Sequence, residues 1–284
     1  QIVLAARVPL VERDYDVADF IASRKGHAYH DSIEKAWSNP GPALRKLGYP
    51  QKVIDAVRIN PTVIEPWTVP VFLERRSERT INGYTISGKF DQSIEGELYD
   101  TKSTSVWSWI KGTKDEDYSW QGSIYRWLNP KIITQDTMAI QFIFTDWSAA
   151  MARANPNYPQ QRTLERRLDL MSLPETENYI RGRLALLDKF YDAPQDELPR
   201  CTDEELWRSE PAWKYYKNPE AIAKGGRSTK NFDNKQDAYM QLATDGNVGK
   251  VVEVPGQVKA CRYCPGFYAC TQKDKYLESG ELQL

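Results

Sequence analysis

The sequence has 284 residues and a formal net charge of -1, so it lacks the global basic character of a protein that holds nucleic acid by charge alone. Apolar residues make up 40% and charged residues 27%, which is typical of a globular protein and excludes a largely disordered chain. There is no apolar stretch of the roughly 18 residues that a membrane helix needs, and the first residues lack the order of a signal peptide. We therefore expect a soluble, cytoplasmic protein.

The amino-terminal part predicts helices. From residue 17 to 37 apolar side chains recur at helical spacing, as in Phe20, Ile33 and Trp37, which predicts a helix with a break near Gly26. Between residues 39 and 70 prolines recur among short apolar groups. Proline removes a backbone donor and interrupts regular structure, so short helices and loops are expected there.

A β-hairpin is predicted next. Residues 84–91 alternate between apolar and polar types, which is the period of a strand. A turn at Glu95 and Gly96 then leads to residues 98–103, the expected antiparallel partner. We expect Asp91 to end the first strand and Asp100 to lie inside the second. A helix over residues 120–128 and an apolar central strand over 137–145 should follow, which indicates a mixed sheet with helices against it.

The remaining sequence predicts more helix and a smaller second unit. Residues 161–192 carry leucines at helical spacing interrupted by Pro174, which predicts two helices. Beyond residue 200 we expect a strand at 213–217, a basic loop at 224–230, a helix at 234–243 and a strand at 250–254. The predicted organisation is a core over residues 1–195 and a carboxy-terminal lobe over residues 196–284, in an α/β fold.

Two carboxylates and a lysine on the hairpin carry the chemical signal. Asp100 and Lys102 are two residues apart on a strand and so project from one face, where a metal-binding carboxylate and a cation can meet one phosphate. Asp91 on the neighbouring strand adds oxygen ligands of the kind that Mg²⁺ or Mn²⁺ prefers. The Asp-x-Lys tripeptide alone is common on solvated strand faces. Its context favours phosphodiester chemistry, because a helix behind the hairpin carries Gln121 and Tyr125 on one face.

This set of motifs resembles the PD-(D/E)XK nuclease superfamily, and within it the RecB-like exonucleases, which include CRISPR-adaptation nucleases and phage exonucleases. Four pieces agree in order and spacing: residues 26–30 (GHAYH), 88–91 (GKFD), 100–102 (DTK) and 121–125 (QGSIY). The resemblance covers about residues 20 to 145. It implies a restriction-endonuclease-like core, in which a mixed central sheet is flanked by helices.

The resemblance also implies a role for each matching residue. His30, Asp91 and Asp100 would bind Mg²⁺ or Mn²⁺, with the Thr101 carbonyl as a further ligand, and Lys102 would be the catalytic lysine. Gln121 and Tyr125 would support the site and the DNA strand. Phe90 stands where the superfamily's name has proline, a departure common in the RecB-like branch. His27 is left out of the metal set. Glu74, on a strand before the hairpin, is either another acidic neighbour of the site or, as we expect, part of an exposed strand end.

The four cysteines form a second possible metal site. Cys201 is followed by Cys261, Cys264 and Cys270 in a C-x2-C-x5-C pattern, which in an intracellular protein argues for metal and against disulfides. Thiolate sites suit both Zn²⁺ and iron-sulfur clusters. RecB-like nucleases that carry a [4Fe-4S] cluster have three cysteines at this spacing, but their fourth precedes the nuclease motifs. A cluster, zinc and free thiols therefore remain alternatives.

Together these features predict a metal-dependent deoxyribonuclease, with exonuclease activity in phage or mobile-element DNA processing or recombination. A recombination partner protein is a further expectation. The basic loop with Lys224, Arg227 and Lys230 is a candidate contact to DNA phosphates. The alternatives are a sequence-specific endonuclease of the restriction or transposition type and a catalytically silent DNA-binding adaptor.

Overall fold

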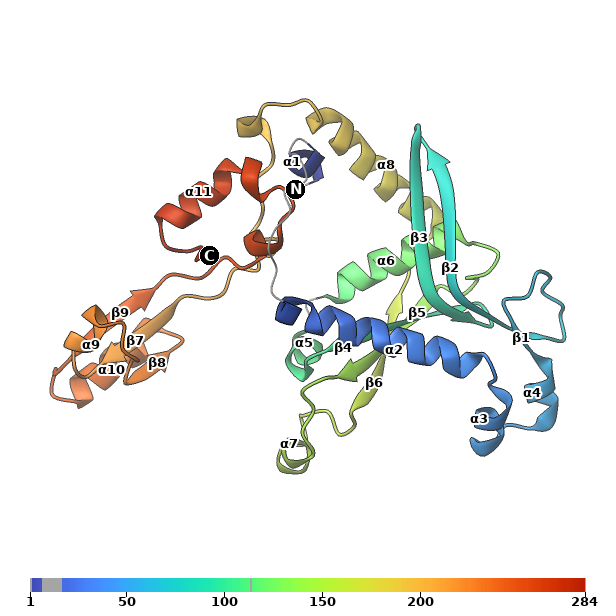
Figure 1. The fold of residues 1–284 in the computed structure, drawn as a ribbon, viewed down its shortest axis with the longest axis horizontal. Helices are drawn as coiled ribbons and strands as arrows, with labels where there is room; N and C mark the ends of the chain where they lie inside the picture. The colour runs from blue at the N-terminus through green and yellow to red at the C-terminus, as the bar shows by residue number, and fades with distance from the viewer. Residues whose placement is uncertain (1, 7–16, 113, 284) are drawn as a thin grey trace. The chain divides into compact units, whose positions relative to one another are not determined.

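The fold was determined as a computed structural model that describes residues 2–6, 17–112 and 114–283 (Figure 1). Its contacts divide the chain into two units. One unit spans residues 14–185, and the other consists of residues 1–13 and 186–284. The predicted division lay at residues 195 and 196, whereas this boundary falls inside a helix.

The larger unit is built on a mixed six-stranded sheet with the strand order β1-β2-β3-β4-β5-β6. The β1–β2 and β4–β5 pairs are parallel and the others are antiparallel. The sheet is therefore mixed, as the sequence predicted, with β5 inside it. The strands are β1 (Val57–Ile59), β2 (Val69–Ile81), β3 (Tyr84–Ile94), β4 (Glu97–Thr104), β5 (Thr137–Phe144) and β6 (Thr163–Asp169).

Helices pack against this sheet. α2 lies along β4, and α6 contacts β2, β3, β5 and β6 (Figure 1). The helices of this unit are η1 (Val17–Phe20), α2 (Ile21–Trp37), α3 (Gly41–Lys46), α4 (Gln51–Ala56), α5 (Val106–Lys111), α6 (Asp115–Leu128), α7 (Ala149–Ala154) and α8 (Leu173–Phe190), whose last turns belong to the other unit. In the part of the chain that the structure describes, no helix combines the length and apolar character needed to cross a bilayer.

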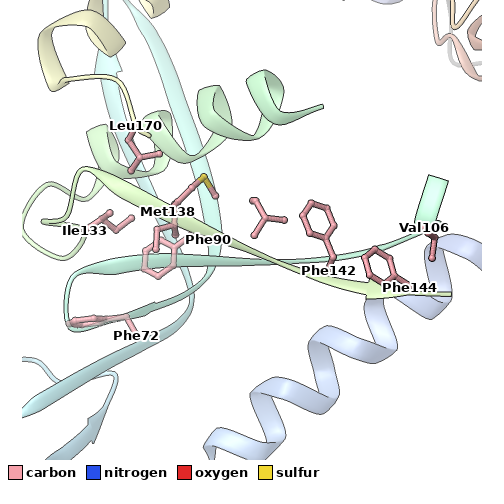
Figure 2. Packing of buried hydrophobic residues seen from close by; sticks show 10 residues of the cluster. Phe72, Phe90, Val106, Ile133, Met138, Phe142, Phe144 and Leu170 are labelled. Carbon is pink, nitrogen blue, oxygen red and sulfur yellow. The ribbon is translucent and has the colours of Figure 1, made fainter. Parts of the chain in front are cut away.

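The main core lies between the strands and α6. Figure 2 shows side chains from β2, β3 and β5 converging there, among them Phe72, Phe90, Met138 and Phe142. Gly122 on α6 makes this packing possible, because a Cβ at that position would lie 2.3 Å from the Met138 sulfur. The interior is close-packed, so these contacts fix the distance of α6 from the sheet.

Two expectations from the amino-terminal half were wrong. α2 runs without a break through Gly26. A single glycine inside a helix costs only about 1 kcal/mol, and α2 lies close to β4 here, since the Ser103 Oγ is 3.4 Å from where a Cβ of residue 26 would be. Asp91 does not end its strand, since β3 continues to Ile94. The hairpin itself, the helix around residues 120–128 and the strand at 137–144 are confirmed.

One predicted helix is a strand. Residues 163–169 form β6, which pairs with β5 along its whole length and alternates between exposed and half-buried residues. Leu164 and Leu168 are four residues apart, a spacing that fits one face of a helix and one face of a strand equally well. The neighbouring strand decided between the two, because it offers β6 a ladder of hydrogen bonds. The helix predicted beyond Pro174 is present as α8.

The smaller unit contains a three-stranded antiparallel sheet with the order β8-β7-β9. The predicted strands near residues 213 and 250 and the helix near residue 234 are confirmed as β7, β9 and α10. Its elements are α1 (Ile2–Ala6), η2 (Gln195–Glu197), β7 (Ala212–Tyr216), α9 (Glu220–Ala223), β8 (Lys230–Phe232), α10 (Lys235–Thr244), β9 (Lys250–Val254), η3 (Ala260–Tyr263), η4 (Phe267–Ala269) and α11 (Thr271–Glu278).

The packing of β3 against α6 can be tested at Gly88. A Cβ there would lie 2.9 Å from the Tyr125 ring and 3.0 Å from Leu128, so we expect Gly88→Ala to lower the free energy of unfolding by about 1 to 3 kcal/mol through overpacking. Gly182 on α8 is the matched control, because nothing lies within 4 Å of its Cβ position. There the same substitution should raise stability by up to about 1 kcal/mol through helix propensity. Urea unfolding measures both, and equal effects would contradict the packing argument.

Candidate functional site

The site begins where β3 and β4 separate. Their ladder consists of the pairs Gln92↔Tyr99, Ser93↔Leu98 and Ile94↔Glu97. Beyond it the Thr101 backbone N–H donates to the Asp91 Oδ2 at 2.9 Å. A carboxylate thus takes the place of the missing ladder partner, because a buried N–H group needs an acceptor. This contact fixes Asp91 beside the strand that carries Asp100.

A histidine and a second acidic residue meet Asp91 on the α2 side. The His30 Nδ1 lies 3.3 Å from the Asp91 Oδ2. Glu74 joins them from β2, and one ligand atom from each of the three lies within 4.8 Å of the other two. An imidazole nitrogen with carboxylate oxygens is a donor set that suits Mn²⁺ or Mg²⁺. The three residues line a pocket of about 10 Å³ together with Ile33, Glu34, Leu73, Gln92 and Thr101.

Sequence reasoning missed Glu74. It does not lie at an exposed strand end but inside β2, between the pairs Leu73↔Gln92 and Arg75↔Phe90, and therefore opposite Asp91. A signal was available in the two residues between β2 and β3. Asn82 and Gly83 both have positive φ, as a two-residue hairpin turn requires, and this turn fixes the register. Counting outward from the turn places position 74 opposite position 91.

The other predicted residues form a chain of contacts toward α6. The Lys102 Nζ lies 2.6 Å from the Asp100 Oδ2 and donates to the Gln121 Oε1 at 3.4 Å. The Gln121 Nε2 in turn donates to the Tyr125 hydroxyl at 2.9 Å. The Tyr118 ring, which the sequence did not single out, lies 5.5 Å from the Lys102 ammonium. The structure thus brings these four predicted side chains together, with the lysine at their centre.

Burial and like charge make the two aspartates costly to ionise. Burial, reinforced by the Asp100 carboxylate, raises the pKa of Asp91 to about 6, although the Thr101 N–H, His30 and Lys102 oppose the rise. Burial also raises the pKa of Asp100, which is 2% exposed, and Lys102 opposes it. A bound cation would favour the charged form of both groups. The electrostatics are therefore those of a site suited to a metal ion.

The cysteines belong to the smaller unit. Cys261 lies in η3 and is buried. Burial raises its pKa to about 11, and the thiols of Cys270, Cys264 and Cys201 add to the effect. Among the described residues no three sulfur atoms lie within 4.8 Å of one another. The thiols are thus neighbours but not gathered into a ligand set, and the metal site stays a prediction.

The predicted basic loop lies in the same smaller unit. The Lys224 Nζ is 3.7 Å from a Glu220 carboxylate oxygen, and the Lys230 Nζ donates to the Gln241 Oε1 at 3.4 Å. Arg227 follows the glycine pair Gly225 and Gly226. These contacts are between exposed groups and hold the lysines weakly. A role of the loop in binding phosphates stays a prediction.

Comparisons with known proteins add little. No family model matches the sequence, and no curated protein matches it. Among solved structures, the crystal structure of SSO0001 is similar at 17% sequence identity and a TM-score of 0.28, over 41% of this chain and 50% of that chain. The match thus spans half the length of that protein. A likeness of this strength supports no argument about function.

The cost of ionising Asp91 can be measured through the pH dependence of the free energy of unfolding. In the folded protein its pKa is about 6, against an ordinary value of 3.8, so the charge destabilises the fold increasingly as pH rises from about 4 to above 6. Asn can still accept from the Thr101 N–H. We expect Asp91→Asn to stabilise the metal-free protein by on the order of 2 kcal/mol at neutral pH and to give no gain near pH 4. Urea unfolding with a chelator at both pH values tests this, and a gain independent of pH would contradict it.

Proposed function

We propose that the chain is a divalent-metal-dependent deoxyribonuclease of the RecB-like branch of the PD-(D/E)XK superfamily, with a restriction-endonuclease-like core. The observation that carries the proposal is the position of Lys102. Its ammonium group lies between Asp100 and Gln121, next to a second carboxylate that is itself paired with a histidine. Metal ligands beside a cation suit phosphodiester hydrolysis, because a bound ion can activate water and the cation can stabilise the charge that develops on the phosphate.

The residues divide the work of hydrolysis between them. His30, Asp91 and Asp100 would hold Mg²⁺ or Mn²⁺, with the Thr101 carbonyl as a further donor. The bound ion would supply a water of lowered pKa and neutralise phosphate charge. The water would lose a proton to solvent, its oxygen would bond to phosphorus as the bond to the leaving sugar oxygen breaks, and that oxygen would take up a proton from solvent. Lys102 stabilises the negative charge that grows on the phosphate oxygens.

Gln121 and Tyr125 keep the lysine in place. A lysine side chain has four rotatable bonds, so its ammonium group needs partners to stay at one position. The Gln121 carbonyl oxygen accepts from Lys102, and the Tyr125 hydroxyl accepts from the Gln121 amide. The tyrosine ring rests against the position of Gly88. The proposed function of this pair is to orient Lys102 toward the phosphate.

The variant Lys102→Met tests the catalytic proposal. It removes the cation and keeps the apolar length of the side chain, so we expect cleavage of end-labelled linear DNA with Mn²⁺ to fall by about 100-fold or more. Lys131→Met is the matched control, because it makes the same substitution at an exposed lysine that follows α6. This variant should cleave DNA as the unmodified protein does. Equal activity in Lys102→Met and the unmodified protein would overturn the assignment.

The form of the DNA separates the proposed exonuclease from its alternatives. An exonuclease degrades linear DNA and leaves closed circles intact, whereas a sequence-specific endonuclease cuts both. A DNA-binding adaptor would bind DNA and cleave neither form with any divalent metal. We expect degradation of the linear form alone, in a role in phage or mobile-element DNA processing or recombination.

For the four cysteines we propose a [4Fe-4S] cluster with a structural role. Thiolates are the ligands of such clusters, and the thiols of Cys270, Cys264 and Cys201 all lie near enough to the buried Cys261 sulfur to influence it. Protein purified without oxygen should be brown and contain stoichiometric iron and sulfide, and Cys261→Ser should lose the colour and melt at a lower temperature because metal binding stabilises the folded unit. Stoichiometric zinc in place of iron, or neither metal, would contradict the cluster.

A further inference from the structure

We propose that Glu74 is a ligand of the catalytic cation, that Gln92 supplies a further oxygen to it, and that Lys89 neutralises Glu74 until the cation binds. The inference rests on the proposed metal-dependent function and specifies its cation site. The motif resemblance assigns no role to these three residues. The register of β2 on β3 sets Glu74 opposite Asp91, and Lys89 and Gln92 lie on β3 within two residues of Asp91.

The first argument is geometric. Ligand atoms of His30, Glu74 and Asp91 all lie within 4.8 Å of one another, which is close to the separation of about 4.2 to 4.6 Å that two ligands at about 2.1 to 2.3 Å from one ion can have at most. Asp100 is engaged differently, because its carboxylate is paired with Lys102 at 2.6 Å. The imidazole and the two half-buried carboxylates therefore form the set already spaced for a cation.

The second argument is an oxygen without a partner. Gln92 is 4% exposed and lines the same pocket. Its amide nitrogen donates to the Gln141 Oε1 at 3.3 Å, whereas its Oε1 is buried and has no hydrogen-bond partner among the described residues. A buried acceptor in this state costs about 1 to 3 kcal/mol. A cation, or a water bound to it, would satisfy this oxygen.

The backbone at Glu74 supports the same assignment. Glu74 has φ of 48° in the middle of a strand, a left-handed conformation that is unfavourable for a non-glycine residue. Strain of this kind costs about 1 to 3 kcal/mol and concentrates at functional sites. Here it accompanies a carboxylate that stands opposite Asp91, where the regular ladder is interrupted.

Lys89 is the partner of Glu74 when no metal is bound. Its ammonium donates to the Glu74 Oε2, so the two side chains form an ion pair. Lys89 and Asp91 are two residues apart on β3, so the lysine lies at the margin of the pocket. A divalent ion competes with this single charge for the carboxylate. Removing the lysine should therefore favour the ion.

Direct binding of Mn²⁺, followed by electron paramagnetic resonance of the free ion, tests the assignment on the full chain. Glu74→Gln keeps the shape of the side chain and removes its charge, and we expect it to weaken Mn²⁺ binding by about tenfold or more. Glu78→Gln makes the same change at an exposed position of the same strand and should stay within about twofold. Lys89→Met should tighten binding, because it removes the competing cation.

The opposite signs separate a ligand from a structural ion pair. If the Glu74–Lys89 pair only stabilised the hairpin, breaking it from either side would weaken Mn²⁺ binding equally, and that result would overturn the proposal. Unchanged binding in Glu74→Gln would also overturn it, and melting temperatures show whether each variant is folded. The binding readout is independent of cleavage. If Glu74→Gln loses Mn²⁺ binding but the unmodified protein cleaves no DNA, the proposed nuclease function is wrong and the cation site stands. If the unmodified protein cleaves DNA but Glu74→Gln binds Mn²⁺ as before, the nuclease function stands and the role of Glu74 is wrong.

Discussion

The candidate site depends on one hydrogen bond, from the Thr101 backbone N–H to the Asp91 carboxylate. It forms where β3 and β4 stop pairing, so a side chain replaces a backbone acceptor. Because the N–H is buried and must be satisfied, the carboxylate has little freedom to move away. In this fixed position, burial and, after it, the neighbouring Asp100 carboxylate raise the pKa of Asp91, and the carboxylate lies within reach of His30.

Successive side chains of β4 point to opposite faces of the sheet, so the site contacts α6 on one face and α2 on the other. Asp100 and Lys102 share one face, from which Lys102 reaches Gln121 on α6. Thr101 and Ser103 share the other face, where Ser103 meets Gly26 on α2. The close approach of α6 to β3 needs a glycine at position 88, because a Cβ there would lie 2.9 Å from the Tyr125 ring. The apolar core packs the sheet against α6 and so fixes the strands that carry Asp91 and Asp100.

Much of this was readable from the sequence because it depends on local periodicity. Alternation over residues 84–91 gave the strand, and the spacing of Asp100 and Lys102 gave their common face. A spacing of four residues gave the hydrogen-bonded pair Gln121 and Tyr125. The motif order also gave His30, which only the fold could bring to Asp91. The strand, the common face and the Gln121–Tyr125 pair are set by the geometry of a single helix or strand, which neighbouring residues dictate, whereas His30 came from the resemblance to the nuclease motifs.

The tertiary structure decided what local pattern leaves ambiguous. Leu164 and Leu168 fit a helix as well as a strand, and pairing with β5 made them a strand. Glu74 has no distinguishing neighbours in the sequence, and it becomes a candidate ligand only because the register of β2 on β3 sets it opposite Asp91. The spacing of the four cysteines likewise left their mutual distances open. Sequence determined which residues share a face of one element, whereas contacts between elements, whose energies depend on the whole fold, determined which faces meet.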